Sequence, residues 1–164
     1  MKRLSIVLEF MLLLVLVAVL LMGAAIFLNS VPLTGSPGFG TRTWTYLTDH
    51  QAESRPDSPF LELQPPTYEM PPGRLFKATL EAVKGLRWEV TAQNRASRQI
   101  QAVATTPILR QKSDISIRVQ TLGGGKSAVY VRSVSRRQLG DLGANSGNIL
   151  KLYRTIDIML PLLP

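Results

Sequence analysis

The sequence contains no cysteine and only one histidine among its 164 residues. Without cysteine there are no disulfides, no thiolate metal ligands and no cysteine to carry a lipid anchor. His50 stands alone in a polar stretch, which is typical of a surface residue, and there is no second histidine to complete a metal site. We therefore expect neither a metal ion nor a cofactor.

Charge is missing from one long stretch, the nineteen residues from Phe10 to Leu28. At a rise of about 1.5 Å per residue, a helix of this length reaches roughly 28 Å, close to the thickness of the hydrocarbon layer of a bilayer. Lys2 and Arg3 precede the stretch, and short positive flanks remain in the cytoplasm. The sequence predicts a single-pass anchor in the cytoplasmic (inner) membrane, with the C-terminal domain extracytoplasmic, that is, periplasmic.

A cleaved signal peptide is the alternative interpretation of this stretch. Gly23 and Ala25 are small residues of the kind found at a cleavage site. The apolar core of a signal peptide is typically about 7 to 15 residues long, however, and this one is longer. Length therefore favours an anchor that is retained.

Acidic residues are scarce in the second half of the chain. The whole sequence has a net charge of +8, and from Arg95 to Arg154 eleven basic residues are accompanied only by Asp114 and Asp141. A basic surface attracts polyanions, and outside the cytoplasmic membrane the abundant polyanions are anionic lipid headgroups, so we expect no nucleic-acid partner. The alternative is that these charges only solvate exposed strand faces.

Proline and glycine are frequent between residues 29 and 72, which argues against a long helix or a central strand there. We interpret this region as a tether followed by an extended arm. The alternation of polar and apolar residues in Arg42–Thr48 predicts a short strand, and Phe60–Leu63 predicts an edge strand.

Hydrophobic periodicity becomes regular from residue 73 onward. Apolar residues at helical spacing predict one helix that ends near Gly85 and a final helix over 145–160. Gly123–Lys126 has the chemistry of a hairpin tip and not of a phosphate-binding loop, because a strand follows it where a helix is required. Alternating residues predict four strands between the helices, at 88–92, 99–104, 114–119 and 127–132.

These elements predict an α+β fold. A single N-terminal transmembrane helix is followed by a domain in which two helices pack on a four-stranded antiparallel meander, in the order helix-β-β-β-β-helix. The predicted divisions are an anchor at 1–28, the tether and arm at 29–72, and the α+β domain at 73–164.

The most distinctive residues follow the fourth predicted strand. They read Val131-Arg-Ser-Val-Ser-Arg136, and then Asp141-Leu-Gly-Ala-Asn145 where the final helix opens. The pattern R-S-x-S-R followed by D-L-G-x-N and a helix resembles the signature of domain-of-unknown-function family 1499. Gly85-Leu-Arg-Trp-Glu-Val90 and Glu53-Ser-Arg-Pro-Asp-Ser-Pro-Phe60 agree with the same family. The resemblance implies an uncharacterised, membrane-anchored member and supplies no activity.

One interpretation of this signature is a structural clasp between the last strand and the last helix. Asn145 is then the N-cap of the helix, and Gly143 allows a positive φ angle just before it. Asp141 gains from the helix dipole, and it either pairs with Arg132 or Arg136 or accepts hydrogen bonds from the backbone N–H groups that open the helix. Backbone groups of the loop are satisfied by two hydroxyl groups, those of Ser133 and Ser135.

The other interpretation is an anion site. Three arginines have only one acidic residue near them, and arginine beside a helix N-terminus is a common way to hold a phosphate or carboxylate. The candidate residues are Arg132, Arg136 and Arg137.

Three function classes follow. The first is a membrane-tethered, non-enzymatic binding or scaffold protein, a candidate accessory subunit that contacts other membrane-protein subunits. The second is a binding module for an anionic lipid or another phosphorylated ligand through the arginines. The third is a hydrolase, which is disfavoured because no serine lies in a nucleophile elbow and the arginines keep Asp114 and Asp141 ionised.

Overall fold

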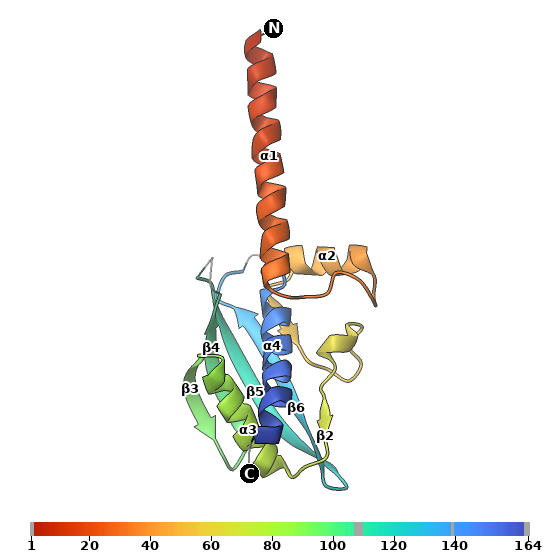
Figure 1. The fold of residues 1–164 in the computed structure, drawn as a ribbon, viewed down its shortest axis with the longest axis vertical. Coiled ribbons are helices and arrows are strands. Elements are labelled where there is room, and N and C mark those ends of the chain that lie inside the picture. The colour runs from red at the N-terminus through yellow and green to blue at the C-terminus, as the bar shows by residue number, and fades with distance from the viewer. Residues whose placement is uncertain (1, 107–109, 139, 163–164) are drawn as a thin grey trace.

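The computed structural model describes residues 2–106, 110–138 and 140–162. This part of the chain forms an α+β domain that continues from a long N-terminal helix (Figure 1). Its four α-helices are α1 (Lys2–Leu28), α2 (Phe39–Thr48), α3 (Pro72–Gly85) and α4 (Ala144–Met159). Its strands are β1 (Gln51–Glu53), β2 (Thr67–Tyr68), β3 (Glu89–Asn94), β4 (Gln99–Thr105), β5 (Lys112–Gly123) and β6 (Lys126–Ser135), with short 3-10 helices η1 (Leu61–Leu63) and η2 (Leu160–Leu162).

The first helix, α1, projects away from the rest of the molecule (Figure 1). Its segment Ile6–Leu28 is long and apolar enough to cross a membrane, and nearly all of its large side chains are exposed. The exception is Ile26 in the last turn, which is buried against Val31, Tyr46 and Leu150. The end of α1 is therefore docked on the domain.

The sheet is antiparallel, and β3 to β6 are hydrogen-bonded in sequence order as the predicted meander. Residues of β5 show the alternation most clearly, since Ile115, Ile117 and Val119 are buried while the residues between them are exposed. The hairpin between β5 and β6 turns through three glycines with positive φ angles, and Gly123 pairs with Lys126. The predicted hairpin tip is confirmed.

The prediction of a four-stranded sheet is wrong, because the proline-rich arm adds two strands to it. β1 pairs with the end of β6 over Arg132 to Val134, and β2 pairs with its beginning at Ser127 and Ala128. The described sheet thus has six strands, in the order β1-β6-β5-β4-β3 with β2 beside β6. These short strands cover an edge that would otherwise expose unpaired backbone groups.

Two predicted strands of the arm are helices in the structure. Arg42–Thr48 lies in α2, where Arg42 and Tyr46, four residues apart, share the buried side. Phe60–Leu63 is the η1 turn and its N-cap. Alternating threonines in α2 imitate the strand pattern, but the burial of the arginine and tyrosine follows the helical period.

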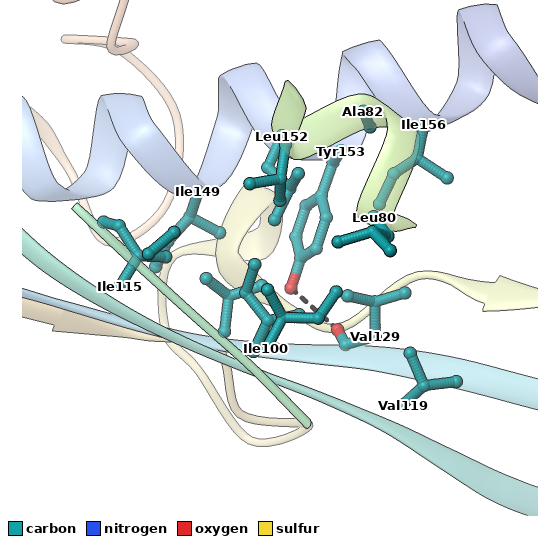
Figure 2. Close-up of a cluster of buried hydrophobic side chains, with 14 of the residues drawn as sticks. Leu80, Ala82, Ile100, Ile115, Val119, Val129, Ile149, Leu152, Tyr153 and Ile156 are labelled. Atoms are coloured by element: carbon teal, nitrogen blue, oxygen red, sulfur yellow. Dashed lines mark hydrogen bonds between the residues drawn. The ribbon is translucent and has the colours of Figure 1, made fainter. Parts of the chain in front are cut away.

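Helices α3 and α4 cover one face of the sheet, and the core lies between the layers (Figure 1). Figure 2 shows Leu152, Tyr153 and Ile156 projecting from α4 towards the sheet. The phenol of Tyr153 donates a hydrogen bond to the carbonyl of Val129 over 3.0 Å, which ties the helix to β6. The other face of the sheet is open.

Candidate functional site

The signature residues of β6 alternate between the two faces of the sheet. Ser133 and Ser135 are buried beneath α4, and Arg132 and Arg136 are exposed on the open face. This follows from the two-residue period of a strand, because the serines continue the side occupied by Val131. The signature therefore contains two separate sets of residues, an inner polar set and an outer basic set.

Asp141 organises the start of α4. One of its carboxylate oxygens accepts a hydrogen bond from the amide of Gly143 over 2.8 Å, and the other accepts one from the amide of Asn145 over 2.9 Å. Gly143, with a φ of 79°, is the N-cap residue and supplies no side chain. The carboxylate of Asp141 thus replaces the missing cap and lies at the positive end of the helix dipole.

The burial of Asp141 also shapes its electrostatics. Removal from water raises the pKa of this carboxyl, whereas the amides of Asn145 and Gly143 lower it by binding the charged form. The net direction is upward, so burial outweighs the amides. Both carboxylate oxygens accept hydrogen bonds from amides at the start of α4, as the side chain of a helix cap does.

The side chain of Asn145 links three segments of the chain. Its Oδ1 accepts a hydrogen bond from the hydroxyl of Ser133 over 2.6 Å. Its Nδ2 donates to the carbonyl of His50 over 2.7 Å and to the hydroxyl of Ser135 over 3.1 Å. Asn148 adds a donor to Ser133 at 3.3 Å. We call Ser133, Ser135, Asp141, Asn145 and Asn148 the inner polar network.

The structure places Asp141 in one of its two predicted arrangements and Asn145 away from the N-cap position. Asp141 is hydrogen-bonded to the amides that open α4, which was one of its two predicted arrangements, and is not paired with Arg132 or Arg136. The arginines project from the opposite face of the sheet and cannot reach it. Asn145 is also not the N-cap, because the helix begins at Ala144 and Asn145 is its second residue.

The three arginines do not converge on one point. Arg136 forms an exposed ion pair with Asp114 over 2.8 Å, and it lowers the pKa of that carboxyl. Arg132 donates to the side-chain amide of Gln51 over 2.8 Å. Four residues of strand separate Arg132 from Arg136, or roughly 13 Å, which is too far to hold one phosphate group together. Among the residues that the structure describes, Arg137 has no hydrogen-bond or ion-pair partner.

A buried ion pair that we did not predict holds α2 in place. Arg42 is 2% exposed, and its guanidinium contacts both carboxylate oxygens of Glu62, at 2.5 and 3.0 Å. It also donates to the carbonyls of Pro32 and Ser36, and it lies over the ring of Phe60. Glu62 raises the pKa of Arg42. The two partners are twenty positions apart, with two prolines between them, so no local pattern in the sequence indicates the pair.

Two hollows mark the surface near these groups. One is apolar, with a volume of about 310 Å³, and it lies between the last turns of α1 and the residues that open α4, including Met22, Leu28 and Leu142. The other is polar, about 380 Å³, and it lies on the open sheet face beside Gln101 and Arg132. In the described ranges, no three acidic or histidine side chains approach one another closely enough to hold a metal ion.

Residues 45–156 match the family model described as "Protein of unknown function (DUF1499)". No curated protein matches the chain. Among solved structures the chain is similar to the one titled "Crystal structure of Ara h 8.0201", at 14% identity and a TM-score of 0.45, over 70% of this chain and 99% of that one.

Proposed function

We propose that this chain, which belongs to the DUF1499 family, is a membrane-tethered, extracytoplasmic protein that binds or scaffolds other proteins and catalyses no reaction. The observation that carries this proposal is α1, whose apolar side chains are exposed over Ile6–Leu28. Exposed apolar surface of this extent is stable only in a bilayer or in contact with another apolar surface. Lys2 and Arg3 at its start support a cytoplasmic N-terminus.

The tether and its direction have a direct test. We expect the chain to stay in the membrane fraction after extraction with alkaline carbonate, and the domain to become accessible to protease once the outer side of the membrane is exposed. Release by carbonate contradicts the tether, and protection of the domain contradicts its orientation.

The open face of the sheet is the surface that we assign to a protein partner. It is polar and carries Arg118, Tyr130 and Arg132 around the hollow described above. Polar surfaces with charge suit partners that associate reversibly, and charge complementarity sets the rate and specificity of such contacts. A partner within a membrane complex would therefore present an acidic, polar surface to this face.

Cross-linking in native membranes followed by purification in mild detergent tests the scaffold. We expect a second protein to be recovered with the intact chain, and its yield to fall in the variant Arg118→Glu/Arg132→Glu. The control is Lys77→Glu on the exposed side of α3, which leaves the open face unchanged. Recovery of the chain only as a monomer contradicts the proposal.

Our second proposal is that the chain binds anionic lipid or another phosphorylated ligand. Arg137 supports it because this arginine has no partner within the described residues, and Arg132 supports it because its hydrogen bond goes to a neutral amide. Arg136 is already neutralised by Asp114. In vesicle flotation with anionic lipid, Arg132→Ala/Arg137→Ala should weaken binding more than Arg136→Ala. Equal binding of all forms to neutral and anionic vesicles contradicts it.

A further inference from the structure

Helix α2 lies crosswise at the end of α1 (Figure 1). The arrangement is fixed by packing, because Ile26 in the last turn of α1 is buried against Tyr46 of α2. The loop between them is residues 29–38, and Arg42 binds three of its carbonyls, those of Pro32, Gly35 and Ser36. The position of α2 relative to α1 is therefore part of the folded structure.

The two sides of α2 differ in character. Arg42 and Tyr46 are buried against the domain, where Arg42 meets Glu62. Trp44 is two residues from Arg42, or about 200° round the helix, and so lies on the opposite side. The exposed side presents two large apolar side chains, namely Trp44 (70% exposed) and Leu47 (38%), and Phe39 (62%) is exposed at the first position of the helix.

The exposed side of α2 also carries no charged side chain. Arg42 is the only charged residue of the helix, and it is buried and paired. The hydroxyl of Thr43 donates to the carbonyl of Phe39, and that of Thr48 donates to the carbonyl of Trp44, each over 2.9 Å. Polar groups satisfied within the helix are what an apolar surrounding demands.

The length of α1 sets the level at which α2 lies. The 23 residues Ile6–Leu28 rise about 34 Å, whereas the hydrocarbon layer is about 30 Å thick, so the end of the helix reaches the headgroup region. Because Arg42 and Tyr46 point to the domain, the side that bears Trp44 points in the direction in which α1 extends. Phe27 (82% exposed) and Leu33 (36%) lie at the same end of α1.

We propose that α2 lies in the headgroup interface of the bilayer that α1 spans, with Trp44 and Leu47 inserted to the boundary of the acyl chains. This inference rests on the proposed function, because it requires α1 to be in a membrane. Tryptophan is enriched at this depth because its ring is amphipathic, and amphipathic helices lie in this plane with the apolar side inward. The occupant of the exposed side of α2 is therefore lipid, and α2 is a second attachment of the domain to the membrane.

The chain offers a clean fluorescence experiment, since it has two tryptophans, Trp44 and Trp88. We would reconstitute the full-length Trp88→Phe variant in phosphatidylcholine vesicles containing lipid brominated at a shallow or a deep acyl position. We expect Trp44 to lose most of its emission, and the shallow bromines to quench it more than the deep ones. The matched control, Trp44→Phe, reports Trp88 on the sheet and should show no quenching by either lipid.

Alkaline carbonate extraction of the same vesicles separates the two proposals. If the chain resists extraction but Trp44 is not quenched, α2 is not in the interface, and the inference is overturned while the tether stands. Stronger quenching by the deep bromines, or quenching equal to that of Trp88, also overturns it. If carbonate releases the chain, the proposed function fails and the inference fails with it.

A spin-labelled variant tests the same inference without replacing either tryptophan, in case the tryptophan variants misfold. Gly40 is exposed on α2 and an added Cβ meets no atom within 4 Å, and the chain has no cysteine of its own. A nitroxide on Gly40→Cys should therefore be more accessible to oxygen than to a water-soluble nickel complex. The reverse order overturns the inference, and a nitroxide on Lys77→Cys supplies the value for a water-exposed helix.

Discussion

Asp141 stabilises α4 from outside the helix, because its two oxygens accept hydrogen bonds from the amides of Gly143 and Asn145, and the N-cap glycine has no side chain to do so. Asp141→Ala leaves both amides without a partner in a buried place, so we expect unfolding to become easier by about 2 kcal/mol. Asp57→Ala, at an exposed position, should change stability by less than about 0.5 kcal/mol. Urea denaturation of both variants measures the difference, and equal losses would show that Asp141 is not a cap.

Lys151 supplies a pH-dependent test at the same scale. Burial lowers the pKa of this half-buried lysine, so its charged form is disfavoured in the folded protein. The folded state therefore gains stability as the pH rises through the lowered pKa towards the value of the unfolded chain, about 10.4. Lys151→Met removes the desolvated charge, so it should stabilise the protein at pH 7 and lose that advantage as the pH approaches 10.

Thermal unfolding between pH 6 and 10 measures this effect. The control is Lys77→Met on the exposed side of α3, which should not stabilise the protein at pH 7. A stability difference between wild type and Lys151→Met that stays constant across the range would contradict the assignment.

The inner polar network shows what the sequence already indicates at the level of residues. Val129 and Val131 were predicted to face inward, and the strand period then places Ser133 and Ser135 on the same side. The arginines between and beyond them must face outward, which rules out a pair with Asp141. The partners of Asn145 depend on the docking of α4 and have no sequence signal.

At the scale of elements, the stability of α2 depends on one ion pair. Arg42→Met leaves the carboxylate of Glu62 and several carbonyls without their donor, and breaking a largely buried pair in this way costs about 3 kcal/mol. Hydrogen exchange should become faster in α2 before it does in the sheet. Arg42→Met/Glu62→Gln should recover part of the loss because no isolated charge remains. Exchange that is unchanged in α2 would show that other contacts hold it.

The elements that the sequence predicts well are those with long, regular patterns. α3, α4 and the strands β3 to β6 each bury one side along several residues and lie where they were predicted, although β5 and β6 are longer than predicted. β1 and β2 have three and two residues, too few to show a period, and they exist because β6 offers an unpaired edge. α2 shows both periods, and its helical form depends on Arg42 meeting a distant glutamate.

At the scale of the whole molecule, the anchor and the domain share a small core of their own. Ile26 is buried against Val31, Tyr46 and Leu150, whereas Phe27, the next residue, is exposed. Ile26→Ser should therefore lower the melting temperature of the full chain in detergent, by the equivalent of about 2 kcal/mol, and Phe27→Ser should change it little. If the two variants have the same melting temperature, the domain is free to move relative to α1.

This shared core also fixes the orientation of the open sheet face relative to the membrane. β5 and β6 run along the long axis of the molecule, the direction in which α1 projects (Figure 1). With α1 upright in a bilayer, the sheet would stand upright on the membrane, and its open face would point sideways and neither towards the membrane nor away from it. Proteins that diffuse laterally in the same membrane then reach that face by diffusion in two dimensions. Freely soluble molecules have no such advantage, and crowding of the membrane, more than concentration in solution, sets how often a partner is found.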